Sequence, residues 1–119
     1  MNDSADHPIS EHDAILLRIF LSERSRWGHQ PLFEAIVVKA RDAGLAGATV
    51  LRGPLGYGAG GTIQTAKILQ LSDNLPVVVE IVDSEESIRG FLESITDMMD
   101  GGLATMQSVR AVHFPKQAK

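Results

Sequence analysis

The chain has 119 residues, which is enough for one domain with a single hydrophobic core and too few for two. Its 44% hydrophobic and 22% charged residues are typical of a soluble globular protein, and the absence of cysteine excludes disulfides and thiolate chemistry. The net charge is −4 and the basic residues are dispersed, which argues against nucleic acid as a partner, because neutralising phosphates requires a basic stripe.

The start of the chain predicts a tail and not a targeting segment. Residues 1–12 are polar and acidic, without the basic and apolar regions of a signal peptide. No apolar stretch is long enough to cross a bilayer, so we expect no membrane insertion and a cytoplasmic location. The expected organisation is a flexible tail over residues 1–12, one domain over 13–114 and a second tail over 115–119.

The first half of the domain predicts a strand, a helix and a second strand. Residues 14–22 (AILLRIFLS) have the β-branched and aromatic character of a buried strand, and a loop follows them. Pro31 suits a helix start and Gly44 suits the position after a helix end. Between them, apolar residues recur at helical spacing: Leu32, Ile36, Val37 and Ala40. Residues 47–53 form the next predicted strand, which runs into a glycine-rich segment.

The second half predicts a strand, a helix and a final strand. Residues 62–72 fit either a short helix or an irregular strand, and the sequence leaves that open. Residues 75–83 form the clearest strand. Asp83 is the expected N-cap of the following helix, with Glu86 completing a capping box. One face of that helix is apolar and consists of Ile88, Phe91, Leu92, Ile95, Met98 and Met99. Residues 108–114 form the last predicted strand.

This order of elements predicts an α+β fold. A βαββαβ chain of this length is most simply a ferredoxin-like sandwich, with a four-stranded antiparallel sheet and both helices on one face. In that topology the first strand lies between the third and the fourth strands.

Alternation along the strands predicts what lies on the other face of the sheet. The set expected to face outward is largely apolar and consists of Leu16, Phe20, Val78, Val82, Val112 and Phe114, around Arg18, Glu80 and Arg110. Soluble proteins usually bury an apolar patch of this kind, so we expect homo-oligomerisation through the sheet, with Arg18 paired to Glu80. The alternative is that these charges are simply solvated on a half-exposed sheet.

The glycine-rich segment is the first candidate binding site. Gly56, Gly58 and Gly61 have the spacing of a dinucleotide fingerprint, but the strand does not lead directly into the first glycine and the chain is too short for two nucleotide-binding halves. A P-loop is disfavoured because no lysine precedes Thr62. The remaining possibility is an anion-binding nest of glycine N–H groups with Arg52 at its root. The alternative is a flexible surface loop without a ligand.

A second candidate is the loop SERSRW, which carries Arg26 and Trp27. A cationic and aromatic loop can stack a base or contact a neighbouring subunit, although Trp27 could instead cover the edge of the core. The histidines have no spacing that suggests a metal site: His7, His12, His29 and His113. We therefore expect no metal site. Because no nucleophile is accompanied by a recognisable base, we also expect no enzyme activity.

The sequence GLAGATVLRGPLGYG resembles the second strand and the start of the T-loop in PII signal-transduction proteins. The matching residues are Gly47, Thr49, Val50, Gly56, Tyr57 and Gly58. From about residue 17 to 112 the chain resembles the PII-like family called domain of unknown function 190. The resemblance implies a ferredoxin-like fold, a homotrimer with inward-facing sheets, a T-loop-like arm and a small-molecule pocket between subunits. By position, the pocket beside the arm would be lined by Gly47, Ala48, Thr49 and Arg52.

The resemblance also implies a function. A trimeric sensor would bind a small anionic ligand, with an adenine nucleotide as a candidate, and regulate a partner such as a membrane transporter or an enzyme. The segment DGGLATMQS contains Gly101 and Gly102 but no lysine, and the basic pair that follows in PII proteins is reduced to Arg110. A monophosphate or a smaller anion therefore fits better than a triphosphate. The alternative is a ligand-free trimeric interaction protein that resembles CutA.

Overall fold

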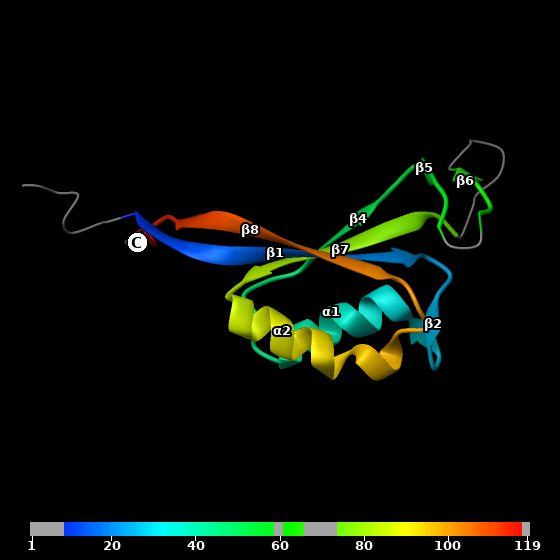
Figure 1. The fold of residues 1–119 in the computed structure, drawn as a ribbon, viewed down its shortest axis with the longest axis horizontal. Helices are drawn as coiled ribbons and strands as arrows, with labels where there is room; N and C mark the ends of the chain where they lie inside the picture. The colour runs from blue at the N-terminus through cyan, green and yellow to red at the C-terminus, as the bar shows by residue number, and fades with distance from the viewer. Residues whose placement is uncertain (1–8, 59–60, 66–73, 118–119) are drawn as a thin grey trace, which may run out of the picture.

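The computed structural model describes residues 9–58, 61–65 and 74–117, and shows one sheet with two helices below it (Figure 1). The elements in chain order are β1 (Ser10–Ser22), β2 (Arg26–Trp27), β3 (Gln30–Pro31), α1 (Leu32–Asp42), β4 (Thr49–Arg52), β5 (Leu55–Gly56), β6 (Gln64–Thr65), β7 (Pro76–Asp83), α2 (Glu85–Ser94), the 3₁₀ helix η2 (Thr96–Met98) and β8 (Leu103–His113). Within the described ranges, no helix has the length and apolar character needed to span a membrane.

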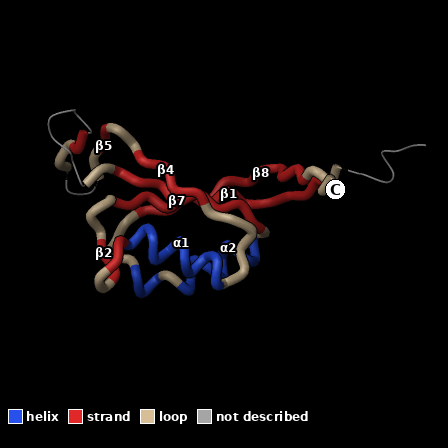
Figure 2. Tube along the Cα trace, turned by 180° about the vertical axis from the view of Figure 1, so that it is seen from behind, coloured by secondary structure: helices blue, strands red, loops and turns tan. Residues whose placement is uncertain are grey.

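The main sheet has the predicted topology. Its strand order is β4-β7-β1-β8 and its three pairings are antiparallel, so β1 lies between β7 and β8. Both α1 and α2 cover the same face of the sheet, as Figure 2 shows from behind. The α+β ferredoxin-like fold is therefore confirmed. Two small antiparallel pairs, β2–β3 and β5–β6, lie outside the main sheet and were not predicted.

The core lies between the sheet and the two helices. The strand residues that alternate with the outward-facing set are almost completely buried, and the largest fully buried side chains are Leu17, Ile19, Ile36, Ile81, Ile88, Ile95, Val77 and Val79. Burying each of these side chains contributes about 1.5–3 kcal/mol relative to leaving it exposed. The predicted apolar positions of both helical segments do supply the other half of this core. The second helix is shorter than predicted, however, because α2 ends at Ser94, and Ile95 and Met98 reach the core from the turn into η2 and from η2 itself.

The ends of the two helices are fixed by local hydrogen bonds. Helix α1 ends in a Schellman motif, in which Leu45 N donates to Ala40 O at 3.1 Å and Gly44 adopts φ 83°, as expected for a glycine at this position. The N-cap of α2 is Ser84 and not Asp83, because the Ser84 hydroxyl accepts from Ser87 N at 3.2 Å.

Asp83 has a different role from the predicted one. Its two carboxylate oxygens accept hydrogen bonds from Ser84 N at 2.7 Å and from Ala46 N at 3.0 Å. The side chain therefore ties the end of β7 to the segment that leads into β4, and cannot also cap the helix.

Strands β1 and β8 are longer than the sequence predicted. They begin at Ser10 and Leu103, pair along the whole of β8, and extend past the helices as a two-stranded ribbon at the end of the molecule that carries the C-terminus (Figure 1). Residues 10–12 are therefore part of the sheet, although the sequence placed them in the flexible tail. No helix covers this part of the ribbon, so its residues are polar on both faces. This part of the strand was not predicted because it lacks the alternation of apolar and polar residues.

The register of β8 corrects the predicted face of Arg110 and Val112. Arg110 lies opposite Asp13, and Val112 lies opposite Glu11. These β1 residues share the helix-side face with Ile15 and Leu17, so Arg110 and Val112 do not lie beside Arg18 and Glu80. Phe114 follows the end of β8 and is exposed. Ion pairs also favour this orientation of Arg110, which pairs with Asp13 at 3.0 Å and with Glu11 at 3.2 Å.

Candidate functional site

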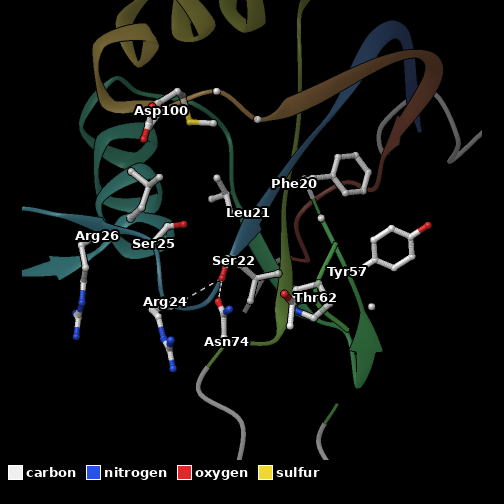
Figure 3. A pocket seen from close by; sticks show the side chains of 18 of the residues that line it. Phe20, Leu21, Ser22, Arg24, Ser25, Arg26, Tyr57, Thr62, Asn74 and Asp100 are labelled. Carbon is white, nitrogen blue, oxygen red and sulfur yellow. Dashed lines mark hydrogen bonds between the residues drawn. The ribbon is translucent and has the colours of Figure 1, made fainter. Parts of the chain in front are cut away.

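The candidate site is a cavity of about 770 Å³ at the end of the molecule opposite the C-terminus. It is bounded by the end of β1, the segment leading into β2, residues 56–58 and 61–62 of the glycine-rich arm (53–62), the start of β7 and the turn before β8. Figure 3 shows Arg24 and Arg26 extending in the same direction from one side of the pocket, with Tyr57 on the other side. This volume lies within the range that small-molecule sites occupy.

A network of backbone hydrogen bonds positions the two arginines. Ser25 N donates to Ser22 O at 3.1 Å, and Leu32 N donates to Ser25 O at 2.7 Å, which fixes the turn between β1 and β2. The hairpin of β2 and β3 then turns at Gly28, whose φ of 63° is a conformation that glycine adopts without strain. The two arginines therefore project from a turn whose backbone is fixed by hydrogen bonds.

The arm crosses closely over the start of β7. A Cβ atom added to Gly56 would lie 3.0 Å from Pro76 Cγ, and one added to Gly53 would lie 3.1 Å from the same atom. Gly53 N also donates to Pro76 O at 2.8 Å. Glycine at these two positions lets the arm pass over the Pro76 ring, and this brings Tyr57 and Gly58 to the rim of the cavity.

The opposite wall is the turn between η2 and β8. Gly101 and Gly102 both have positive φ, 73° and 102°, so the chain turns sharply into β8 after Asp100. A Cβ atom at Gly102 would lie 3.2 Å from Met99 Cε, so this glycine also allows the methionine to reach the cavity.

The lining combines an apolar floor with a polar rim. The floor contains buried or half-buried apolar residues, namely Leu21, Leu32, Val77, Met98 and Met99. The rim carries hydroxyl and amide groups together with Arg24, Arg26 and Asp100. Arg26 forms no ion pair within the part of the chain that the structure describes. A flat apolar group can lie on such a floor while an attached anion reaches the rim.

The cavity contains some of the predicted site residues. Five of them line it: Arg26, Gly56, Tyr57, Gly58 and Gly61. Trp27 does not line the cavity. It belongs to β2 and is 42% exposed. The other four predicted ligand-binding residues, Gly47, Ala48, Thr49 and Arg52, also lie outside it. Their predicted place is a cleft between subunits, which a single chain does not contain.

Arg52 forms an ion pair with Glu23. The side chain of Glu23 is mostly buried, and the backbone N of Glu23 donates to Leu75 O at 2.9 Å. Arg52 ends β4 at the root of the arm, while Glu23 precedes the two arginines of the rim. The pair therefore connects the arm to the turn that forms the other side of the cavity.

Sequence reasoning missed several lining residues. Ser22 and Ser25 belong to the candidate loop SERSRW but were not named as site residues, and Asn74 comes from a distant segment that meets them only through the fold. The hydroxyl of Ser22 hydrogen-bonds to the side chain of Asn74, which joins the end of β1 to the segment before β7. The only available signal was the density of charged and hydroxyl residues in SERSRW, directly after a buried strand.

The open face of the sheet, away from the helices, carries an apolar row beside the cavity. Directly opposed residues on the four strands form this row, in the order Leu51, Val78, Phe20 and Leu103. Leu51 is 49% exposed and Leu103 is 60% exposed. With Leu16 and Val82 these residues form the open-face patch, in which Leu16, Phe20, Val78 and Val82 were predicted. Phe20 also lines the cavity, so patch and cavity adjoin.

A polar cluster lies at the centre of the open-face patch. Arg18 Nε donates to Glu80 Oε2 at 2.9 Å, which confirms the predicted pair, and Arg18 Nη1 lies 3.5 Å from Gln107 Oε1. The two charged side chains are 39% and 27% exposed, so the pair is partly shielded by its apolar neighbours. Such a paired charge can be covered by another protein surface at lower cost than an unpaired one.

Two curated proteins resemble this chain over most of its length. A UPF0166 protein from Aquifex aeolicus is 43% identical over 99 residues, covering 83% of this chain and 93% of that protein. A second UPF0166 protein, from Methanocaldococcus jannaschii, is 35% identical over 86 residues, covering 72% of this chain and 79% of its own length.

Solved structures show the same fold at low sequence identity. CPII, a nitrogen regulatory PII-like protein from Thiomonas intermedia, was solved with ADP, AMP and bicarbonate; it superposes with a TM-score of 0.61 at 15% identity, over 88% of this chain and 92% of that one. A putative PII-like signaling protein from Thermus thermophilus gives 0.59 at 13% identity, over 88% and 93%. The family model described as "DUF190: Uncharacterized ACR, COG1993" matches residues 14–111, and the chain therefore belongs to the DUF190 family, with a PII-like fold.

Proposed function

We propose that this protein is a PII-like sensor with a regulatory, non-catalytic role. It assembles as a homotrimer through the open-face patch and binds a small anionic ligand beside the glycine-rich arm. The observation that carries the proposal is the cavity, in which an apolar floor, the arm and two arginines come together. The fold shared with CPII, which was solved with ADP, AMP and bicarbonate, supports an adenine nucleotide as the ligand.

The chemistry of the lining favours a nucleoside monophosphate over a triphosphate. A base can lie against the methionines and leucines of the floor while Arg26 donates charge-assisted hydrogen bonds to one phosphate. The turn at Gly101 and Gly102 contributes backbone N–H groups but no lysine, and Asp100 beside it would repel additional phosphate charge. We therefore expect AMP to bind more tightly than ATP.

The arm provides the proposed output of the sensor. Exposed apolar side chains lie in its described part, at Leu55 and Tyr57, and directly after it, at Ile63. Ligand contacts to Tyr57 and Gly58 would offset the conformational entropy of a glycine-rich segment and favour one arm conformation. A partner, such as a membrane transporter or an enzyme, would then dock on a surface that depends on the ligand.

Assembly and ligand binding are linked because Phe20 belongs to both the open-face patch and the cavity lining. A second copy that covers the patch would stand directly beside the cavity and could close it. Gly47, Ala48, Thr49 and Arg52 remain the proposed lining of the cleft between copies, and Arg18 and Glu80 the proposed centre of the interface.

Calorimetric titration of the purified protein with AMP, ADP, ATP and cyclic nucleotides tests this proposal. We expect saturable binding, tightest for AMP. Replacing Arg26 by Gln should weaken AMP binding by about 10- to 100-fold, because a hydrogen bond to a charged group contributes roughly 1.5–3 kcal/mol. Arg41→Gln is the matched control, since Arg41 is an exposed arginine at the end of α1 whose ion pair is with its neighbour Asp42.

Two results would contradict the proposal: no heat with any nucleotide, or equal AMP affinity in wild-type protein and Arg26→Gln. The first result would favour the second candidate, a ligand-free trimeric interaction protein of CutA type. The exposed apolar side chains of the arm favour that candidate, because they fit a docking surface without any ligand. It is distinguished by a melting temperature that no nucleotide raises.

A further inference from the structure

Two histidines that are far apart in the sequence meet on the ribbon formed by β1 and β8. His12 lies opposite Ala111, and His113 lies opposite Ser10, so the two histidines are diagonal neighbours on one face. Their Nε2 atoms are 2.9 Å apart, and both side chains are exposed. Sequence spacing gave no sign of this pair, because 100 residues separate its members and only the register of the two strands brings them together.

The orientation of His12 is fixed by its other ring nitrogen. His12 Nδ1 lies 3.1 Å from the backbone oxygen of Asp13. Because a carbonyl oxygen only accepts hydrogen bonds, Nδ1 carries the hydrogen in this contact. In the neutral ring, Nε2 then has a lone pair directed away from the backbone, and in this structure that lone pair accepts a hydrogen bond from His113 Nε2. Metal-binding histidines are oriented in the same way, with the second ring nitrogen donating to a carbonyl or a carboxylate.

The two Nε2 atoms are joined by a hydrogen bond of 2.9 Å, and the two rings are stacked with their centroids 4.9 Å apart. Both nitrogens can therefore approach one point when the rings turn out of the stack. Two imidazole nitrogens with water oxygens form the kind of nitrogen and oxygen ligand set that is typical of Cu²⁺ and Ni²⁺. Protein sites for Zn²⁺ usually supply three or four protein ligands, more than two histidines provide.

We propose that His12 and His113 bind one divalent transition-metal ion, Cu²⁺ or Ni²⁺ in preference to Zn²⁺. The structure places no group of three or more His, Asp or Glu side chains around a common point within the described residues, so water completes the coordination. Binding requires the rings to turn out of their stack and to exchange their mutual hydrogen bond for bonds to the ion, and both rings are exposed at the surface, where they have room to turn. This site lies at the opposite end of the molecule from the cavity (Figure 1), and its function does not depend on the proposed nucleotide site.

Titration of the untagged, full-length protein with NiCl₂, CuCl₂ and ZnCl₂ tests the assignment. We expect one ion per chain and affinity in the order Cu²⁺, Ni²⁺, Zn²⁺. Each of the variants His12→Gln and His113→Gln should weaken Ni²⁺ binding by at least about tenfold, since loss of an outer-shell partner alone has an effect of that size. His29→Gln is the matched control, because His29 is exposed on the turn between β2 and β3 and lies outside the pair.

Electron paramagnetic resonance of the Cu²⁺ complex provides a second reading that does not depend on affinity. We expect hyperfine coupling to two imidazole nitrogens in the wild-type protein and in His29→Gln, and to one in either variant of the pair. The proposal is overturned if Ni²⁺ does not bind saturably, or if the pair variants bind as the wild type does. It is also overturned if His29→Gln weakens binding as much as they do.

Discussion

One face of β1 has two different environments along its length. At Leu17 and Ile19 this face packs against the helices and is fully buried. A few residues earlier, at Glu11 and Asp13, the same face lies beyond the helices and carries charges that pair with Arg110. The strand and its pairing with β8 continue without interruption between the two regions.

The contrast shows that alternation identifies the two faces of a strand but not what covers them. In the covered region the helices exclude water from this face, and aliphatic side chains are therefore favoured there. In the ribbon, water remains, and the register is supported by cross-strand ion pairs and by the two histidines on the other face. A charged residue near the end of a strand can therefore face the helix side of a sheet without being buried.

The largest effect is expected in the covered region. Replacing Ile19 by Ala should lower the free energy of unfolding by about 2–5 kcal/mol, because it leaves a cavity in a fully packed core. Asp13→Ala changes the same face of the same strand where no helix covers it, and should lower stability by at most about 1 kcal/mol. Urea denaturation at one fixed protein concentration measures both. Similar losses for the two variants would contradict the distinction between the regions.

A smaller effect is expected from the ion pairs of the ribbon. Arg110→Ala removes the contacts to Glu11 and Asp13, which are exposed, so its cost should be about 0.2–1 kcal/mol at low salt. Salt screens such pairs, and at about 1 M the difference from wild type should disappear. Thermal melts at low and high salt measure this. A loss that persists at high salt would show that Arg110 contributes by packing and not by charge.

The sequence was sufficient to predict the topology and the core. The apolar periods of α1, α2, β1 and β7 are strong because each packs an apolar face into the core, and the βαββαβ order of these elements then predicted the strand order. The polar ends of the ribbon gave no such signal, so β1 and β8 appeared shorter than they are. The predicted face of Arg110 was wrong for a related reason. The register of β8 depends on its partner strand, which lies about 100 residues away in the sequence.

The candidate site was only partly predictable. Glycine density identified the arm, and Gly56, Tyr57, Gly58 and Gly61 do line the cavity. Ser22 belongs to the predicted loop SERSRW, but its hydrogen bond to Asn74 could not be predicted, because Asn74 lies in a segment with no distinguishing composition and the two meet only after folding. Residues 66–72 of the stretch that the sequence left open lie outside the described residues, while Gln64–Thr65 form β6.

Sedimentation velocity at micromolar concentration tests most directly whether copies of the chain cover the open-face patch. We expect a species of about three times the 12.9 kDa chain mass for the wild type and for Arg110→Glu, whose change lies on the other face. Arg18→Glu places a second carboxylate opposite Glu80 in the proposed interface and should shift the mass toward the single chain. A folded wild-type protein that sediments as a 12.9 kDa monomer would contradict the proposed assembly and, with it, the proposed cleft between copies.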